Sequence, residues 1–133
     1  MSNQNDAQQE RGSATPFILI LAVGLLIMVG LVVDGGGQVN AKDQANSVAQ
    51  SAARAAVVNI SDATGGTPVI DTASAQAAAQ TYIAAAGKTG TVTINGNNVT
   101  VTVTSNYQTV FLSLAGINTL TGSATSTAQL AQR

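Results

Sequence analysis

The sequence predicts an α+β fold in which a long N-terminal helix carries a small head domain. Three patterns predict it: an uncharged apolar run near the N-terminus, an alanine-rich segment with helical spacing, and alternating Thr and Val residues in the C-terminal half. We expect the helix to have a membrane-spanning half and an amphipathic half. We expect the head to contain an antiparallel sheet of about three strands and one or two short helices, because so small a sheet must pack against a helix to be stable.

The apolar run reads PFILILAVGLLIMVGLVV and carries no charge from Pro16 to Val33. At about 1.5 Å per residue it is roughly 27 Å long, close to the thickness of a hydrocarbon core. Thirteen of its residues are Leu, Ile, Val or Phe, so insertion into a bilayer is favoured by roughly 4 to 8 kcal/mol. The run therefore predicts a membrane-spanning helix, represented by Pro16, Phe17, Leu21, Leu25, Met28, Leu31 and Val33.

A cleaved signal peptide is the main alternative to an anchor. Such a peptide has a positive n-region, a shorter apolar stretch and a small-x-small cleavage site. Here residues 1–12 are polar and include both acidic and basic side chains, and Asp34 with the three following glycines is a poor cleavage site. We predict that residues 1–12 are disordered and cytoplasmic, that residues 13–34 cross the bacterial cell membrane once, and that the head is extracytoplasmic.

Asp34 and the glycines Gly35, Gly36 and Gly37 follow the apolar run directly. Asp34 has two interpretations: an inter-subunit contact at the membrane exit, or a residue that stops the span where a carboxylate is less costly. The glycines are either a hinge or the end of the helix. We expect the helix to resume after a glycine break, over residues 35–60.

Small apolar side chains recur at helical spacing between residues 41 and 56. This face has two interpretations, which can both hold. It can pack against other helices, because small residues permit close approach, or against the sheet of its own chain. Its candidate assembly residues are Ala45, Val48, Ala49 and Ala52.

The head domain is predicted over residues 61–133. A loop covers SDATGGTP, and a helix follows over ASAQAAAQTYIAAA, capped by Asp71 or Thr72 and ended by Gly87. Its predicted apolar stripe is Ala75, Ala79, Tyr82 and Ala86.

The rest of the head alternates between Thr and apolar residues. Thr91–Ile94 and Val99–Val103 have the period of strands and are joined by a turn of Asn and Gly. Val110, Phe111 and Leu114 predict a short helix, and Thr119–Gln129 predicts a third strand.

The chain contains neither Cys nor His. This excludes a disulfide framework, thiolate zinc sites and acid–base chemistry by histidine. Five basic and six acidic residues give no basic patch, so a nucleic-acid partner is not expected. We predict no enzyme activity, no cofactor, no metal and no small-molecule substrate.

The motifs ERGS (residues 10–13), LVVDGG (31–36), QSAARAA (50–56) and TVFLSLAGI (109–117) resemble the TadE/TadG-like proteins of Tad (Flp) pilus assembly. The resemblance implies a pilin-like or pseudopilin-like subunit that is anchored in a membrane and contributes to an extracellular filament. Other pilin-like subunits and the assembly machinery are then its partners, in a homo- or hetero-oligomer. Membrane lipid surrounds its helix.

The resemblance also points to Gly12 and Ser13 as a candidate processing site. Processed pilins have a Gly there and a Glu five residues later, whereas this chain has Phe17 at that position and Pro16 before it. Uncleaved TadG-like proteins also exist. The sequence thus predicts a minor pilin or pilus-assembly subunit, and the alternative is a membrane-anchored surface binding module outside any filament.

Overall fold

The first element of the structure is a single long helix. The computed structural model describes residues 6–62, 66 and 68–131, with side chains from residue 14 onward except at 60–65 and 67. Helix α1 spans Asp6–Val57, 52 residues, and continues without interruption through Pro16 and through all three glycines. It therefore includes residues 6–12, for which the composition predicted disorder; residues 1–5 lie outside the described part.

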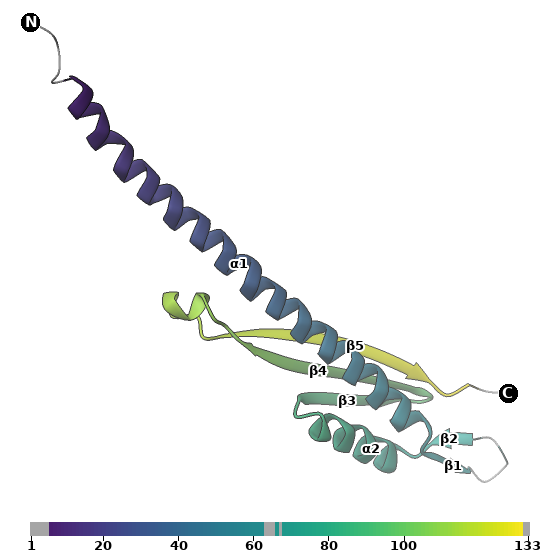
Figure 1. Cartoon of the computed structure of the whole chain (residues 1–133). Coiled ribbons are helices and arrows are strands. Elements are labelled where there is room, and N and C mark those ends of the chain that lie inside the picture. The colour runs from purple at the N-terminus through teal and green to yellow at the C-terminus, as the bar shows by residue number, and fades with distance from the viewer. Residues whose placement is uncertain (1–5, 63–65, 67, 132–133) are drawn as a thin grey trace, which may run out of the picture.

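The head follows in seven elements (Figure 1). Strands β3, β4 and β5 form an antiparallel sheet in that order, while β1 and β2 pair as a separate two-stranded ribbon. The elements are β1 (Ile60–Asp62), β2 (Pro68–Ile70), α2 (Thr72–Ala85), β3 (Thr89–Asn95), β4 (Asn98–Gln108), the 3₁₀ helix η1 (Leu112–Ala115) and β5 (Thr119–Gln129).

The long apolar helix, the second helix and the three-stranded antiparallel sheet confirm the predicted α+β arrangement. The third strand has its predicted bounds, and Asp71 caps α2 as expected, accepting a hydrogen bond from the N–H of Ser74. Other details differ. The ribbon of β1 and β2 lies where the sequence predicted only a loop, β3 begins two residues before the predicted Thr91, and β4 continues five residues past Val103, to Gln108.

The core lies between the C-terminal half of α1 and one face of the sheet, with α2 covering the β3 side (Figure 1). It consists mainly of alanine from the helices and valine from β4, because small side chains let the backbones approach closely. The predicted stripe of α2 is wrong at two positions: Tyr82 and Ala86 are exposed, and Ile83 is buried instead. The turn of the helix places position 83, four residues after Ala79, on the buried face.

The opposite face of the sheet carries threonine. Hydroxyl pairs bridge β4 and β5 across this face, from Thr100 to Thr127 at 3.0 Å and from Thr102 to Thr125 at 2.9 Å. The alternation of Thr with Val in β4 thus separates a polar surface from the core.

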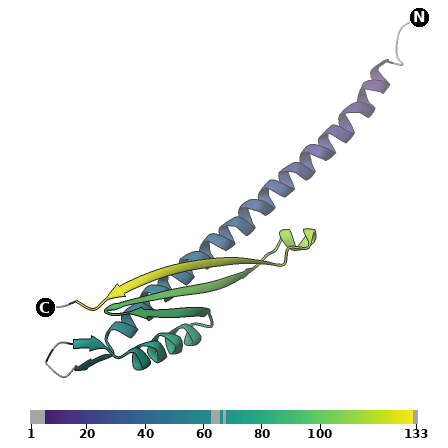
Figure 2. The same ribbon diagram turned by 180° about the vertical axis from the view of Figure 1, so that it is seen from behind.

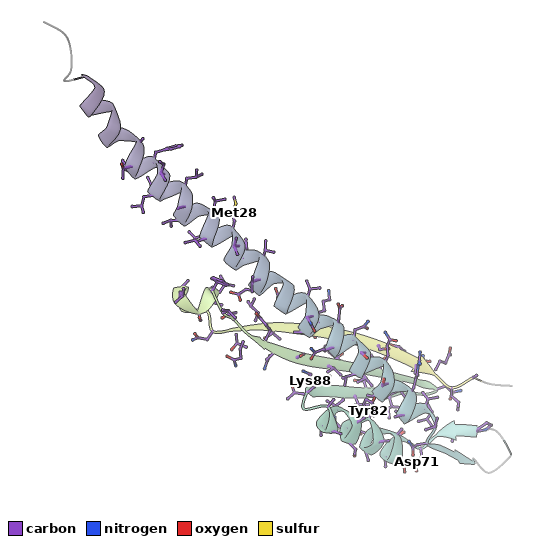
Figure 3. The ribbon with its side chains drawn as sticks, in the orientation of Figure 1. Met28, Asp71, Tyr82 and Lys88 are labelled. Carbon is purple, nitrogen blue, oxygen red and sulfur yellow. The ribbon has the colours of Figure 1, made fainter. Side chains whose placement is uncertain are left out.

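The N-terminal half of α1 projects beyond the head, as both views show (Figure 1, Figure 2). Its apolar side chains are exposed along most of its length, and Met28 stands clear of the head (Figure 3). The connection between β4 and β5, which contains the short helix η1, lies beside this projecting half.

Candidate functional site

The projecting half of α1 has the properties of a membrane-spanning helix. Within Ala14–Val57 its most apolar window has a mean hydropathy of 3.0, and only 6% of that window is buried inside the molecule. All seven residues that represent the predicted span are exposed. Among the described residues this is the one helix long and apolar enough to cross a bilayer.

Asp34, at the end of this span, is completely buried. Its carboxylate accepts hydrogen bonds from three consecutive backbone N–H groups, those of Val110 at 2.8 Å, Phe111 at 3.0 Å and Leu112 at 2.6 Å. The hydroxyl of Tyr107 adds a longer bond of 3.5 Å. We call this set of contacts the Asp34 clamp.

The clamp satisfies donors that the local backbone leaves unpaired. The chain leaves β4 at Gln108 and enters η1 at Leu112, and the first N–H groups of a helix have no partner within it. A carboxylate is the strongest acceptor for such groups, and its charge is favourable at a helix start. The clamp therefore ties the β4–β5 connection to α1.

The carboxylate of Asp34 is thus used within its own chain, as the acceptor for the N–H groups of Val110, Phe111 and Leu112. The sequence offered an inter-subunit contact or a stop residue as its role, and these stay predictions beside the observed contact.

Two glycines of α1 make room for aromatic rings from the head. A Cβ at Gly37 would overlap the ring of Tyr107, and one at Gly30 would lie 2.8 Å from the Cβ of Phe111. Gly35 and Gly36, by contrast, have open space around their Cα atoms. The glycines thus differ in role: Gly37 is a packing position within the chain, and Gly35 and Gly36 face away from its own head.

The alanine face lies against the sheet of its own chain. Ala45, Ala49 and Ala52 are fully buried, and Val48 packs beside them at the edge of the core. These side chains are therefore not accessible to another helix while the head is folded. The predicted packing against the sheet of the same chain is therefore what the structure has, and packing of this face against other helices stays a prediction.

The candidate processing residues Gly12 and Ser13 lie within α1. Their side chains are outside the part that the structure describes. They are far along the helix from the Asp34 clamp, so the structure does not bring these two predicted sites together.

Sequence reasoning did not find Tyr107, the three N–H donors or Gly30. One signal was present: Asp34 is the only charged residue between Arg11 and Lys42. A single carboxylate at the end of an apolar span needs hydrogen-bond donors. The backbone N–H groups at the start of a helix, in an uncharged loop elsewhere in the chain, can supply them. The partner loop itself, more than 70 residues away, leaves no local pattern.

An apolar groove of about 460 Å³ lies on the membrane side of the clamp. One wall belongs to the apolar half of α1 and the other to η1. It is lined by Val23, Leu26, Ile27, Gly30 and Leu31 from the helix, by Phe111 just before η1, and by Leu112, Leu114 and Ala115 from η1.

Residues 12–59 match the model of the family described as Flp pilus-assembly TadE/G-like. The match covers nearly all of α1 and confirms the resemblance seen in the sequence motifs of this helix. It supports a pilus-associated role, with α1 as a single membrane anchor. No curated protein and no solved structure gives a significant match to the chain.

Proposed function

Starting from this TadE/G-like segment, we propose that the chain is a minor pilin or pseudopilin-like structural subunit of a Tad-type pilus. Its apolar helix holds the subunit in the membrane, with the N-terminus cytoplasmic and the head outside. The same helix then associates with other pilin-like helices, in or beneath the filament. The head is displayed on the outer side.

The observation that carries this proposal is the division of α1 into two halves. The head packs on one face of the C-terminal half, whereas the apolar half is exposed along most of its length. Helices without a polar outer face are stable in lipid or against other helices. An element that is exposed and matches a pilus-assembly family is therefore the part suited to assembly.

The face that contains Gly35 and Gly36 is the part of α1 suited to close helix contact. A Cβ at either residue would have no atom within 4 Å, and the absence of a side chain allows another backbone to approach. Buried residues such as Ala49 and Ala52 are unsuitable for testing this, because replacing them with Leu would disrupt the head whatever the function.

The test is deletion of the gene in the source bacterium and complementation with point variants. Deletion should reduce filament number or length, and the wild-type gene should restore filaments. Gly36→Leu should fail to restore them even though the protein reaches the membrane in normal amount. Ala77→Leu is the matched control, because Ala77 is an exposed small residue on α2, and it should restore filaments fully.

Filaments that are unchanged after deletion would contradict the proposal. In that case the chain would be an anchored surface module, in which α1 serves only to hold the head. Electron microscopy of the cell surface gives the filament count, and immunoblotting of membranes gives the amount of each variant.

A further inference from the structure

We propose that the β4–β5 connection, residues 109–118, is a second membrane-inserted element, whose exposed apolar side chains contact lipid acyl chains beside α1. This inference rests on the proposed membrane anchoring by α1. It concerns a part of the head that neither the sequence patterns nor the family match assigns to a membrane.

The position of η1 along α1 is the first argument. The helix residues of the apolar groove, from Val23 to Leu31, lie on the N-terminal side of Asp34, inside the apolar run. At about 1.5 Å per residue they are roughly 5 to 17 Å from Asp34 along the helix axis. Because the apolar run is no longer than the hydrocarbon core, a bilayer that covers the run also covers the level of η1.

The attachment of η1 is the second argument. The Asp34 clamp fixes Val110, Phe111 and Leu112 to α1, and Phe111 packs on Gly30. The loop therefore cannot be at a different depth from the helix residues beside it while the clamp is intact.

The surface of the connection is the third argument. Leu114 is 89% exposed and Val110 57%, and Ile117 and Phe111 are partly exposed beside them. Of these, Phe111 and Leu114 line the groove and so connect the exposed apolar side chains of the loop with the exposed face of the membrane-spanning helix. No charged residue occurs anywhere between Lys88 and Arg133.

The backbone of the connection is the fourth argument, because hydrocarbon offers no hydrogen-bond partners. Three N–H groups are paired by Asp34, and those of Leu114, Gly116 and Ile117 bond to carbonyls within the loop. The hydroxyls of Ser113 and Thr109 also donate to loop carbonyls, those of Val110 and Ile117. Most of the donors are thus satisfied without water.

Together these features give the clamp a reason to lie at the membrane exit. A carboxylate at the edge of a bilayer is costly when it is unpaired, and an irregular loop there is costly when its N–H groups are free. The hydrogen bonds between the carboxylate and the loop N–H groups remove both costs. Lipid is the occupant that these observations favour over a second protein chain, since the groove wall is itself the lipid-facing helix.

Site-specific labelling of the full chain in lipid vesicles tests the inference. The chain has no native Cys, so single cysteines can be introduced at Leu114, or at Ala115 as a second variant, and labelled with an environment-sensitive fluorophore. Ile20→Cys marks the span, and Thr93→Cys, on the exposed face of β3, marks the water-facing head. Nitroxide groups at defined depths on lipid chains quench labels that are in the membrane.

We expect the label at Leu114 or Ala115 to be blue-shifted, protected from iodide and quenched most by shallow nitroxides, at a depth of about 5 to 10 Å below the headgroups. The Thr93 label should remain accessible to iodide. A Leu114 label as accessible to iodide as the Thr93 label, with the Ile20 label quenched by lipid, would overturn the inference and leave anchoring intact.

If the Ile20 label is also in water, the proposed anchoring fails instead. Dilution to about one chain per vesicle separates lipid from a second copy of the protein. Protection that persists on dilution supports lipid contact. Protection that disappears on dilution, together with a disulfide between two Leu114→Cys chains, would show that a second copy covers this surface and would overturn the inference.

Discussion

At the scale of single residues, Asp34 joins two parts of the chain that are far apart in sequence. Its carboxylate accepts three backbone N–H groups at once, whereas an amide has one oxygen and adds two N–H groups of its own. We expect Asp34→Asn to lower the melting temperature in detergent by about 5 °C or more. Circular dichroism measures the change, and Asp43→Asn, at an exposed position of the same helix, should leave it unaltered.

At the scale of elements, Gly122 sets the distance between β5 and α1. A Cβ at this position would lie 2.5 Å from the backbone nitrogen of Lys42. The atoms of α1 that it would meet belong to the helix backbone, so they cannot rotate away as a side chain can. Gly122→Ala should therefore separate strand and helix and cost about 1 to 3 kcal/mol of unfolding free energy. Ser123→Ala, the exposed neighbour, should change it by less than about 0.5 kcal/mol in the same chemical denaturation.

The elements also show what the sequence can predict. The strand at Thr119–Gln129 and the helix after Asp71 were found because their periodicity and capping are local properties. Strand β4 was predicted too short because Ser105 and Tyr107 break the Thr–Val pattern, although both continue its alternation toward α1. The ribbon of β1 and β2 has strands of three residues, too short for a periodic signal.

The candidate site was predictable only on its helix side. The apolar span, Asp34 and the glycines are contiguous, so the sequence marks them directly. Their partners come from the β4–β5 connection, and the fold alone brings them together. The distinction between Gly37, which faces Tyr107, and Gly36, which faces open space, likewise depends on where the sheet lies around the helix.

At the scale of the whole molecule, α1 is one continuous helix from Asp6 through the apolar run to the core of the head. The bond between Gly12 and Ser13 is therefore inside a helix, and a peptidase must unwind the helix to reach it. Phe17 occupies the position where processed pilins have Glu. Both features favour a subunit that keeps the residues before Ser13 when it is in the membrane.

Mass spectrometry of the protein isolated from membranes of the source bacterium tests this directly. We expect peptides that contain Asp6 to Arg11, joined to residues beyond Ser13. A protein that begins at Ser13 would contradict the prediction and would show that processing tolerates Phe17. The variant Phe17→Glu separates the two features, because it restores the missing carboxylate and leaves Gly12 in place. Cleavage of this variant alone would show that the side chain at position 17, and not the helix around Gly12, prevents processing.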